Sequence, residues 1–217
     1  MPFVLLDWDN TLHDSAGTNF AALEMVLRGY GLHVSPDAYR RAYTVDYRRL
    51  YRDLGLADEL VNEASDRWRA LVAGAEPRLL PGVVEALDRL QADGHTMALV
   101  TSAPRAVAER QVLRLGLLDR FAACCYGDGQ PPRPDPQPVR DLLASMGAYP
   151  ADALLCSDTA VDMQMAVAAG VRGIGIASFA FDAGALCAGG AVETAPSLHA
   201  WVAGDGAPCA GAGAGAT

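Results

Sequence analysis

The fold of this chain is decided by residues 3–15, which read FVLLDWDNTLHDS. The run 3–6 is apolar without the alternation of a half-exposed strand, which predicts a strand buried on both faces. Two carboxylates, Asp7 and Asp9, follow it directly. Ligands of an open α/β sheet bind beyond the carboxyl ends of its strands. These carboxylates are therefore the first candidates for a functional site.

Further apolar runs of strand length recur downstream, separated by helical patterns. Strands are expected at residues 97–100, 122–126, 153–156 and 174–177. Helices are expected at residues 82–92, 105–115, 137–146 and 161–169, most of them closed by a glycine, as helix C-termini prefer. This alternation predicts an α/β fold with a doubly wound, Rossmann-like parallel sheet.

One connection is far longer than the others, because roughly 70 residues separate the first strand from the helix at 82–92. A structureless loop of that length is uncommon in a compact domain, and helical patterns at 18–28, 36–54 and 58–73 fill it. The sequence therefore predicts an all-helical cap at 15–78, inserted between core segments 1–14 and 79–203. Residues 204–217 are rich in glycine and alanine and are expected to form a disordered tail.

Composition narrows the class of protein. The formal net charge is −9, which disfavours nucleic-acid binding because such binding needs a positive surface. No apolar run approaches the roughly 20 residues of a membrane span. The chain has five cysteines, an odd number without metal-ligand spacing, and these are expected to be thiols in a reducing compartment. We expect a cytoplasmic monomer or homodimer that acts on a small metabolite, without a nucleic-acid or membrane partner.

Three other strands also end at polar residues. The second is followed by Thr101-Ser102, the third leads to Arg133-Pro134-Asp135-Pro136, and the fourth leads to a segment that runs from Ser157 through Asp158 to Asp162. In this order the motifs resemble those of the haloacid dehalogenase superfamily, in the subfamily with a helical cap after the first strand, which includes phosphoglycolate phosphatase and β-phosphoglucomutase. The resemblance covers roughly residues 3–203.

The resemblance implies a role for each carboxylate. Asp7 would be the nucleophile that attacks phosphorus, and Asp9 would protonate the leaving oxygen and then take a proton from water. Repulsion between a carboxylate and a phosphate dianion calls for a divalent ion, and Mg²⁺ suits oxygen ligands. By family likeness, the protein ligands of Mg²⁺ are the Asp7 side chain, the Asp9 backbone carbonyl and Asp158. Asp162 would lie in or near the set of residues that contact these ligands.

The phosphate-binding groups implied by the resemblance are the Thr101 hydroxyl and the backbone N–H groups of Trp8 and Ser102. The family adds a lysine in a Lys-Pro-x-Pro motif. This chain has 17 basic residues, all of them arginine, and the motif carries Arg133 instead. Arginine keeps the charge but is longer and planar, so the change is compatible with activity at a slower rate.

Two smaller departures lie in the same motifs. Ser157 stands where glycine usually precedes the acidic pair, and its side chain is expected to crowd or rigidify the metal loop. Asn10 replaces a usual glycine, a milder change. Structural roles compete with the functional ones: Asp158 as a helix N-cap, Asp162 as an exposed first-turn residue, and Arg133 as a solvated arginine.

Tyrosines recur every four residues within the expected helix 36–54, at Tyr39, Tyr43, Tyr47 and Tyr51. This spacing predicts one stripe along one helix. Either the stripe packs inside the cap, or residues among Tyr43, Tyr47 and Arg48 face the core and select the leaving group of the substrate. His13 and His33 have no obvious partner and are expected at the surface.

The function predicted from these motifs is Mg²⁺-dependent hydrolysis of a small phosphomonoester through an aspartyl-phosphate on Asp7, with the cap excluding water. The main alternative is a weakened or non-enzymatic domain that binds a phosphorylated ligand or a protein, because of Arg133 and Ser157. A phosphomutase usually has a histidine where this chain has Asn19. The presence of Asp9 argues against a dehalogenase and against phosphonoacetaldehyde hydrolase. The latter also uses a lysine of the cap, and this chain has no lysine.

Overall fold

The computed structural model describes residues 3–44 and 46–210 and divides the chain into two compact units. One unit holds the described residues up to His13 and from Pro77 onward. The other spans Asp14–Glu76. Each unit has its own packing and is described separately.

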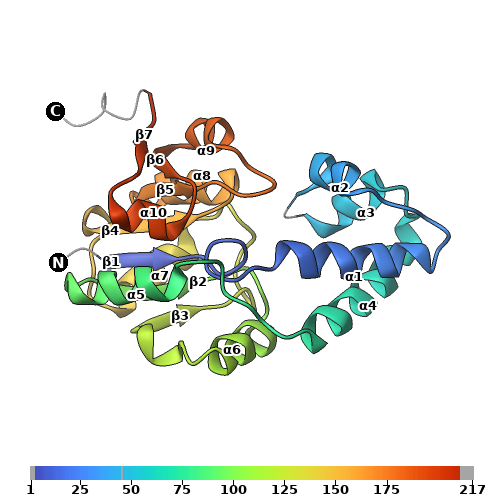
Figure 1. Ribbon diagram of the computed structural model, residues 1–217, viewed down its shortest axis with the longest axis horizontal. Coiled ribbons are helices and arrows are strands. Elements are labelled where there is room, and N and C mark those ends of the chain that lie inside the picture. Colours follow the sequence, from blue (N-terminus) through green and yellow to red (C-terminus); the bar gives the residue numbers. More distant parts are fainter. Residues whose placement is uncertain (1–2, 45, 211–217) are drawn as a thin grey trace. The chain divides into compact units, whose positions relative to one another are not determined.

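The first unit is built on a seven-stranded sheet with the order β3-β2-β1-β4-β5-β6-β7 (Figure 1). The strands are β1 (Phe3–Leu6), β2 (Thr96–Val100), β3 (Ala123–Cys125), β4 (Ala153–Ser157), β5 (Arg172–Ile176), β6 (Ala191–Ala195) and β7 (Ala207–Pro208). All neighbouring pairs are parallel except β6 and β7. Three consecutive residues of β1, from Val4 to Leu6, are fully buried, because helices cover both faces of the sheet.

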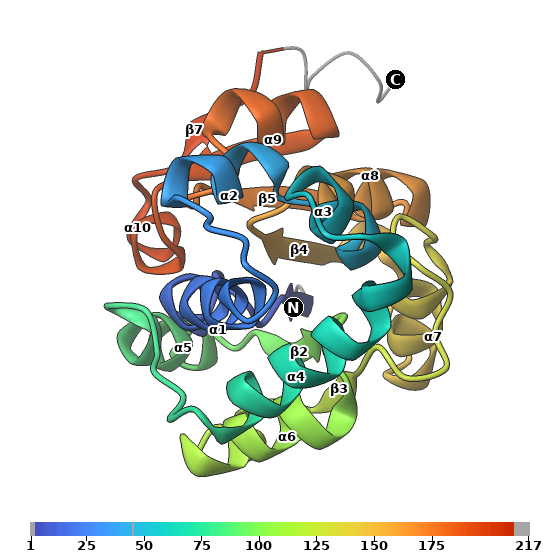
Figure 2. The same ribbon diagram turned by 90° about the vertical axis from the view of Figure 1, so that its right-hand side faces the viewer.

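Two sets of helices cover the sheet, on opposite faces. α5 (Val83–Ala92), α6 (Arg105–Arg114) and α10 (Leu198–Ala203) share one apolar cluster with Val4 and Leu6. α7 (Gln137–Ser145) and α8 (Ala160–Ala169) share another with Leu5, and α9 (Ala183–Gly189) packs against α8. Figure 2 shows α5 and α10 on one side of the strands and α7 and α8 on the other. The prediction of a doubly wound α/β fold is confirmed.

The second unit has helices and no strand within residues 14–44 and 46–76. It contains α1 (Ala16–Arg28), α2 (Pro36–Ala42), α3 (Tyr47–Asp53), a short 3₁₀ turn (Asp58–Leu60) and α4 (Val61–Gly74). α1 and α4 pack together, and the Trp68 indole N–H donates a hydrogen bond to the Asn19 carbonyl oxygen at 3.1 Å. Within the described residues, no helix is long and apolar enough to cross a bilayer.

The prediction of a single helix at 36–54 is wrong, because the helix is interrupted between α2 and α3. The Thr44 hydroxyl accepts a hydrogen bond from the Asp46 N–H at 3.3 Å, and the Asp46 carboxylate accepts from the N–H groups of Arg48 at 3.0 Å and Arg49 at 3.3 Å. These local bonds satisfy the backbone of a new helix start and so compete with a continuous helix. The predicted tyrosine stripe is therefore divided between two helices.

The prediction of a disordered tail from residue 204 onward is wrong for residues 204–210. β7 pairs with β6, and the Cys209 N–H donates to the Val192 carbonyl oxygen at 3.0 Å, so residues 204–210 belong to the sheet unit. Residues 211–217 lie outside the described residues. A disulfide joins Cys187 to Cys209, whose Cα atoms are 5.5 Å apart, so the expectation that all five cysteines are thiols is wrong. The sequence could not show this pairing, because it depends on how α9 and β7 pack.

Candidate active site

Polar residues follow the carboxyl ends of three adjacent strands, β2, β1 and β4, and so lie along one edge of the sheet. The Asp7 N–H donates to the Cys156 carbonyl oxygen at 3.0 Å, which extends the pairing of β1 with β4 by one residue. The Thr101 N–H does the same with the Cys125 carbonyl oxygen at 2.9 Å. Asp7 and Thr101 are thereby held by the sheet itself, and Asp158 directly follows β4.

The loop after β1 closes tightly on itself. The Trp8 carbonyl oxygen accepts hydrogen bonds from the N–H groups of Leu12 and His13, at 3.0 and 2.8 Å. Asn10 lies in the left-handed region, with φ of 57°, and its N–H donates to the His13 carbonyl oxygen at 2.8 Å. Asparagine tolerates this conformation better than most residues, which explains why it can replace a glycine here.

Arg133 joins two of the carboxylates. Its Nη2 donates to Asp7 Oδ1 at 3.0 Å and to the Val100 carbonyl oxygen at 3.4 Å, and its Nη1 donates to Asp162 Oδ2. Only 11% of the arginine side chain is exposed. The alternative that Arg133 is a solvated loop residue is therefore wrong.

The two acidic residues after β4 have distinct surroundings. The N-cap of α8 is Thr159, whose hydroxyl accepts from the Asp162 N–H at 3.2 Å, so the alternative that Asp158 caps this helix is wrong. Asp162 is buried, which excludes the alternative of an exposed first-turn residue. Its Oδ2 also accepts a hydrogen bond from the Ser157 hydroxyl at 2.5 Å. Both carboxylates thus remain available for the site.

Burial has the largest effect on the pKa values of Asp7 and Asp158 at this edge of the sheet. Burial raises the pKa of Asp7 well above its usual value, and the Arg133 guanidinium opposes the rise. Burial also raises the pKa of Asp158 to about 7, while a hydrogen bond from Ser178 opposes it. Burial alone would lower the pKa of Arg133, but the charges of Asp162 and Asp7 outweigh burial and raise it, so the guanidinium stays charged.

The acidic residues offer oxygen ligands of the kind that Mg²⁺ prefers. Asp158 Oδ2 and Asp162 Oδ1 are buried and have no hydrogen-bond partner among the described residues. Unpartnered buried carboxylate oxygens are costly, and a hard cation is a natural partner for them. In the part of the chain that the structure describes, no three His, Cys, Asp or Glu side chains are arranged to hold a metal ion. The donor set therefore fits a cation that takes its remaining ligands from backbone oxygen, water or substrate.

The residues predicted to bind phosphate differ in their exposure to solvent. Thr101 is buried, and its hydroxyl oxygen accepts from the Ala103 N–H at 3.0 Å, which leaves the hydroxyl proton free to donate to another acceptor. Ser102 is exposed at the same strand end. The Trp8 indole is fully buried and donates to Gln111 Oε1 at 2.8 Å, so only the backbone N–H of Trp8 can serve a phosphate.

His13 is a site neighbour that the sequence interpretation missed. It is buried, its ring stacks on the Trp8 indole with centroids 5.3 Å apart, and its Nδ1 lies 3.2 Å from Asp9 Oδ1. The expectation that His13 is a surface residue is wrong, whereas His33 is exposed as expected. The four-residue separation between Asp9 and His13 was the available signal, but it becomes a contact only because the loop turns back.

The predicted substrate-selecting residues all lie in the helical unit. Tyr43 caps α2 and is half-buried, while Tyr47 and Arg48 begin α3 and are exposed. The guanidinium carbons of Arg48 and Arg69 lie 5.6 and 5.7 Å from the centroid of the Tyr47 ring, and Arg48 Nη2 donates to Asn62 Oδ1 at 2.8 Å. Their role in substrate selection stays a prediction.

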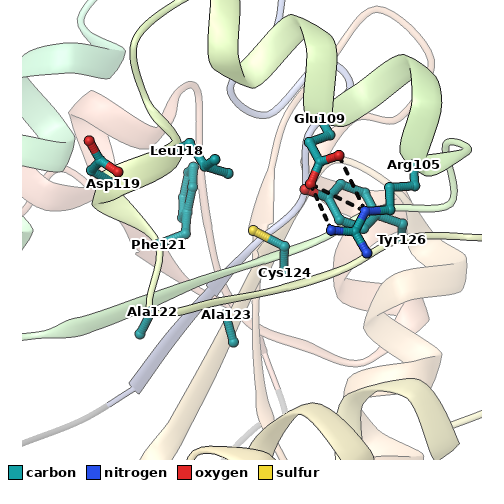
Figure 3. Close-up of a pocket in the computed structure, with 9 residues that line it drawn as sticks. All are labelled: Arg105, Glu109, Leu118, Asp119, Phe121, Ala122, Ala123, Cys124 and Tyr126. Atoms are coloured by element: carbon teal, nitrogen blue, oxygen red, sulfur yellow. Dashed lines mark hydrogen bonds and ion pairs between the residues drawn. The ribbon is translucent and has the colours of Figure 1, made fainter.

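A separate cavity of about 520 Å³ lies between α6 and the edge strand β3 (Figure 3). Arg105 and Glu109 form an ion pair at 2.9 Å on its wall, and the Arg105 guanidinium lies 5.5 Å from the centroid of the Tyr126 ring. None of the predicted site residues lines this cavity. It is therefore distinct from the strand-end site.

Known proteins resemble this chain over most of its length. A family model described as haloacid dehalogenase-like hydrolase matches residues 4–176. A phosphorylated carbohydrates phosphatase from Thermotoga maritima is 28% identical over 205 residues, which cover 88% of this chain and 93% of the relative. A phosphoglycolate phosphatase from Cereibacter sphaeroides is 33% identical over 184 residues, which cover 79% of this chain and 83% of the relative.

Solved structures show the same fold. A haloacid dehalogenase-like family protein from Streptococcus pneumoniae superposes with a TM-score of 0.82 at 19% identity, covering 94% of this chain and 98% of the other. The protein CbbY from Rhodobacter sphaeroides, solved in complex with phosphate, gives a TM-score of 0.73 at 21% identity, covering 92% and 96%. At these identities the likeness shows the fold alone.

Proposed function

We propose that this chain, which belongs to the haloacid dehalogenase-like hydrolases, cleaves small phosphomonoesters through a covalent aspartyl-phosphate on Asp7. As a family phosphatase it acts on small phosphorylated substrates. The observation that carries the finer proposal is the buried Asp7 carboxylate beside the Arg133 guanidinium, 3.0 Å away at the carboxyl ends of the strands. This pairs a nucleophile with a fixed positive charge where the phosphoryl group would be transferred.

In the first step, the Asp7 carboxylate forms a bond to phosphorus while the bond from phosphorus to the leaving oxygen breaks. Asp9 gives its proton to that oxygen. In the second step, water attacks the phosphorus of the aspartyl-phosphate, Asp9 takes a proton from this water, and Asp7 leaves with inorganic phosphate as the product. Asp9 is 37% exposed at its side chain, which fits a group that exchanges protons with substrate and water.

A divalent cation, in our proposal Mg²⁺, would be held by the Asp7 side chain, the Asp9 backbone carbonyl and Asp158, with Asp162 beside them. When bound, it supplies positive charge that offsets the repulsion between the carboxylates and the phosphate dianion. The unpartnered oxygens of Asp158 and Asp162 support this assignment. The cation would also oppose the raised pKa values of Asp7 and Asp158, because positive charge favours the ionised carboxylates.

The phosphoryl oxygens would be bound by Arg133, the Thr101 hydroxyl and the backbone N–H groups of Trp8 and Ser102. Arg133 takes the place of an ammonium group, which no other side chain of this chain can supply. Because its guanidinium already bridges two carboxylates, it can neutralise the transferred charge without first being ordered. We assign selection of the leaving group to the exposed residues Tyr47 and Arg48 of the helical unit, with Tyr43.

The substrates named for the relatives give the first compounds to assay, namely phosphoglycolate and phosphorylated carbohydrates. The chain would be incubated with these esters in the presence of Mg²⁺, with excess chelator as the control, and phosphate release would be measured. We expect release with Mg²⁺ and its loss with chelator, restored by added Mg²⁺. Lack of release from every ester, with the protein folded, would reject hydrolysis in favour of a domain that only binds a ligand.

A further inference from the structure

Two positions at which this chain departs from the family pattern, Arg133 and Ser157, meet on one oxygen atom. The Ser157 hydroxyl donates to Asp162 Oδ2 at 2.5 Å, and Arg133 Nη1 donates to the same oxygen. The other guanidinium nitrogen, Nη2, donates to Asp7 Oδ1 at 3.0 Å. A continuous chain of hydrogen bonds therefore runs from the serine hydroxyl to the proposed nucleophile.

The serine is well placed to fix this chain. Ser157 is the last residue of β4, it is fully buried, and its oxygen also lies 3.4 Å from the Thr159 N–H. The serine hydroxyl is the donor in its hydrogen bond to Asp162, and the carboxylate oxygen accepts. Oδ2 of Asp162 accepts from both donors, and its Oδ1 has no hydrogen-bond partner within residues 3–44 and 46–210. The carboxylate is thus held in one orientation.

A guanidinium depends on that orientation more than an ammonium does. Its donors form a rigid planar fork, so a rotation of the Asp162 carboxylate that displaces Nη1 also displaces Nη2 from Asp7. An ammonium is a compact charge with three donors that rotate freely, and it tolerates such a rotation. A glycine at position 157 would remove one of the two donors that the structure shows on Asp162 Oδ2 and leave the Arg133 donor.

We propose that Ser157 is a positioning residue that, through Asp162, aims the Arg133 guanidinium at Asp7, so that the two departures work as a pair. The proposal deepens the proposed function and rests on it for its effect on turnover. Ser157 acts on the reaction through Asp162 and Arg133 and is not itself catalytic. A merely space-filling serine would instead affect the protein equally whether residue 133 carried a guanidinium or an ammonium.

A kinetic double-mutant cycle tests the pairing, using Ser157→Ala, Arg133→Lys and the double variant, with p-nitrophenyl phosphate and Mg²⁺. We expect Ser157→Ala to lower kcat about tenfold in the arginine protein, as for a lost hydrogen bond to a charged group, with little change in KM. In the Arg133→Lys background we expect the same change to lower kcat by less than about twofold. Equal losses in both backgrounds would overturn the proposal.

Unfolding by urea, without metal or substrate, gives a readout that does not depend on turnover. We expect Ser157→Ala to lower the midpoint clearly in the arginine protein and much less in the Arg133→Lys background. Ser145→Ala removes a serine hydroxyl that donates to the Leu142 carbonyl oxygen in α7, and it should shift both backgrounds equally. Additive midpoints for Ser157 would overturn the pairing. If the wild-type protein released no phosphate, the proposed function would be rejected. The unfolding cycle would still show whether Ser157 and Arg133 are coupled.

Discussion

The strand-end loops of the sheet unit and the α2–α3 segment of the helical unit both carry conspicuous polar patterns, yet only the loops are arranged as the sequence indicated. The loops follow strands whose positions are fixed by parallel pairing on both sides of β1. The α2–α3 segment depends on local hydrogen bonds around Thr44 and Asp46, which end one helix and begin another. A motif tied to a sheet edge is thus a safer guide than a periodicity within a short helical region.

The largest effect is expected at the sheet edge, from Asp7→Asn. The amide cannot form the aspartyl-phosphate, so we expect kcat to fall by about a thousandfold or more. Phosphate release from the best ester would be measured beside a circular dichroism spectrum as a control for folding. Release at the wild-type rate by the folded variant would reject Asp7 as the nucleophile.

The next effect contrasts two tyrosines that the sequence placed on one stripe. Tyr51 is buried and its hydroxyl donates to the Ala64 carbonyl oxygen at 3.3 Å, whereas Tyr47 is 39% exposed. We expect Tyr51→Ala to lower the free energy of unfolding by about 3 kcal/mol, as for a buried aromatic side chain. We expect Tyr47→Ala to lower it by less than about 1 kcal/mol.

Urea unfolding of the two tyrosine variants measures this difference. Tyr51→Phe is the matched control, because it removes only the hydroxyl and should cost about 1 kcal/mol. Equal destabilisation by Tyr47→Ala and Tyr51→Ala would indicate that both tyrosines of α3 are buried and would contradict the exposed position of Tyr47.

A smaller effect on turnover is expected from His13→Ala. The ring contacts the Asp9 carboxylate at 3.2 Å and stacks on Trp8, so its loss frees the proposed acid and base to rotate. We expect kcat to fall about tenfold with KM nearly unchanged, as for one lost hydrogen bond to a charged group. His33→Ala, at an exposed position of the helical unit, is the control and should leave kcat unchanged.

The smallest effect is expected from Arg48→Ala in the helical unit. Arg48 is exposed, and its guanidinium contacts Asn62 of α4 and the Tyr47 ring at the protein surface, so we expect no loss of folding. If it binds the leaving group, KM should rise about threefold to tenfold for esters with an anionic or ring-bearing leaving group and stay constant for esters with a small uncharged one. A KM that is unchanged for every ester would remove Arg48 from substrate selection.

Local pattern and the order of motifs along the chain were sufficient to predict the strands and the approximate position of the site. Continuous apolar runs identified five strands, because a strand buried on both faces needs apolar side chains at every position. The order of the motifs then indicated that Asp7, Thr101, Arg133 and Asp158 approach one another, since parallel strands end at one edge of a sheet.

The individual side-chain contacts depend on the folded chain and could not be predicted. The contact of His13 with Asp9 requires the turn at Asn10, and the Cys187–Cys209 disulfide requires β7 to pair with β6. The convergence of Ser157 and Arg133 on Asp162 requires α8 to begin within a few residues of the end of β4. Each of these contacts depends on side-chain direction over long separations in sequence or on a backbone reversal. Composition and periodicity carry neither kind of information, because they describe a residue's neighbours along the chain rather than its neighbours in space.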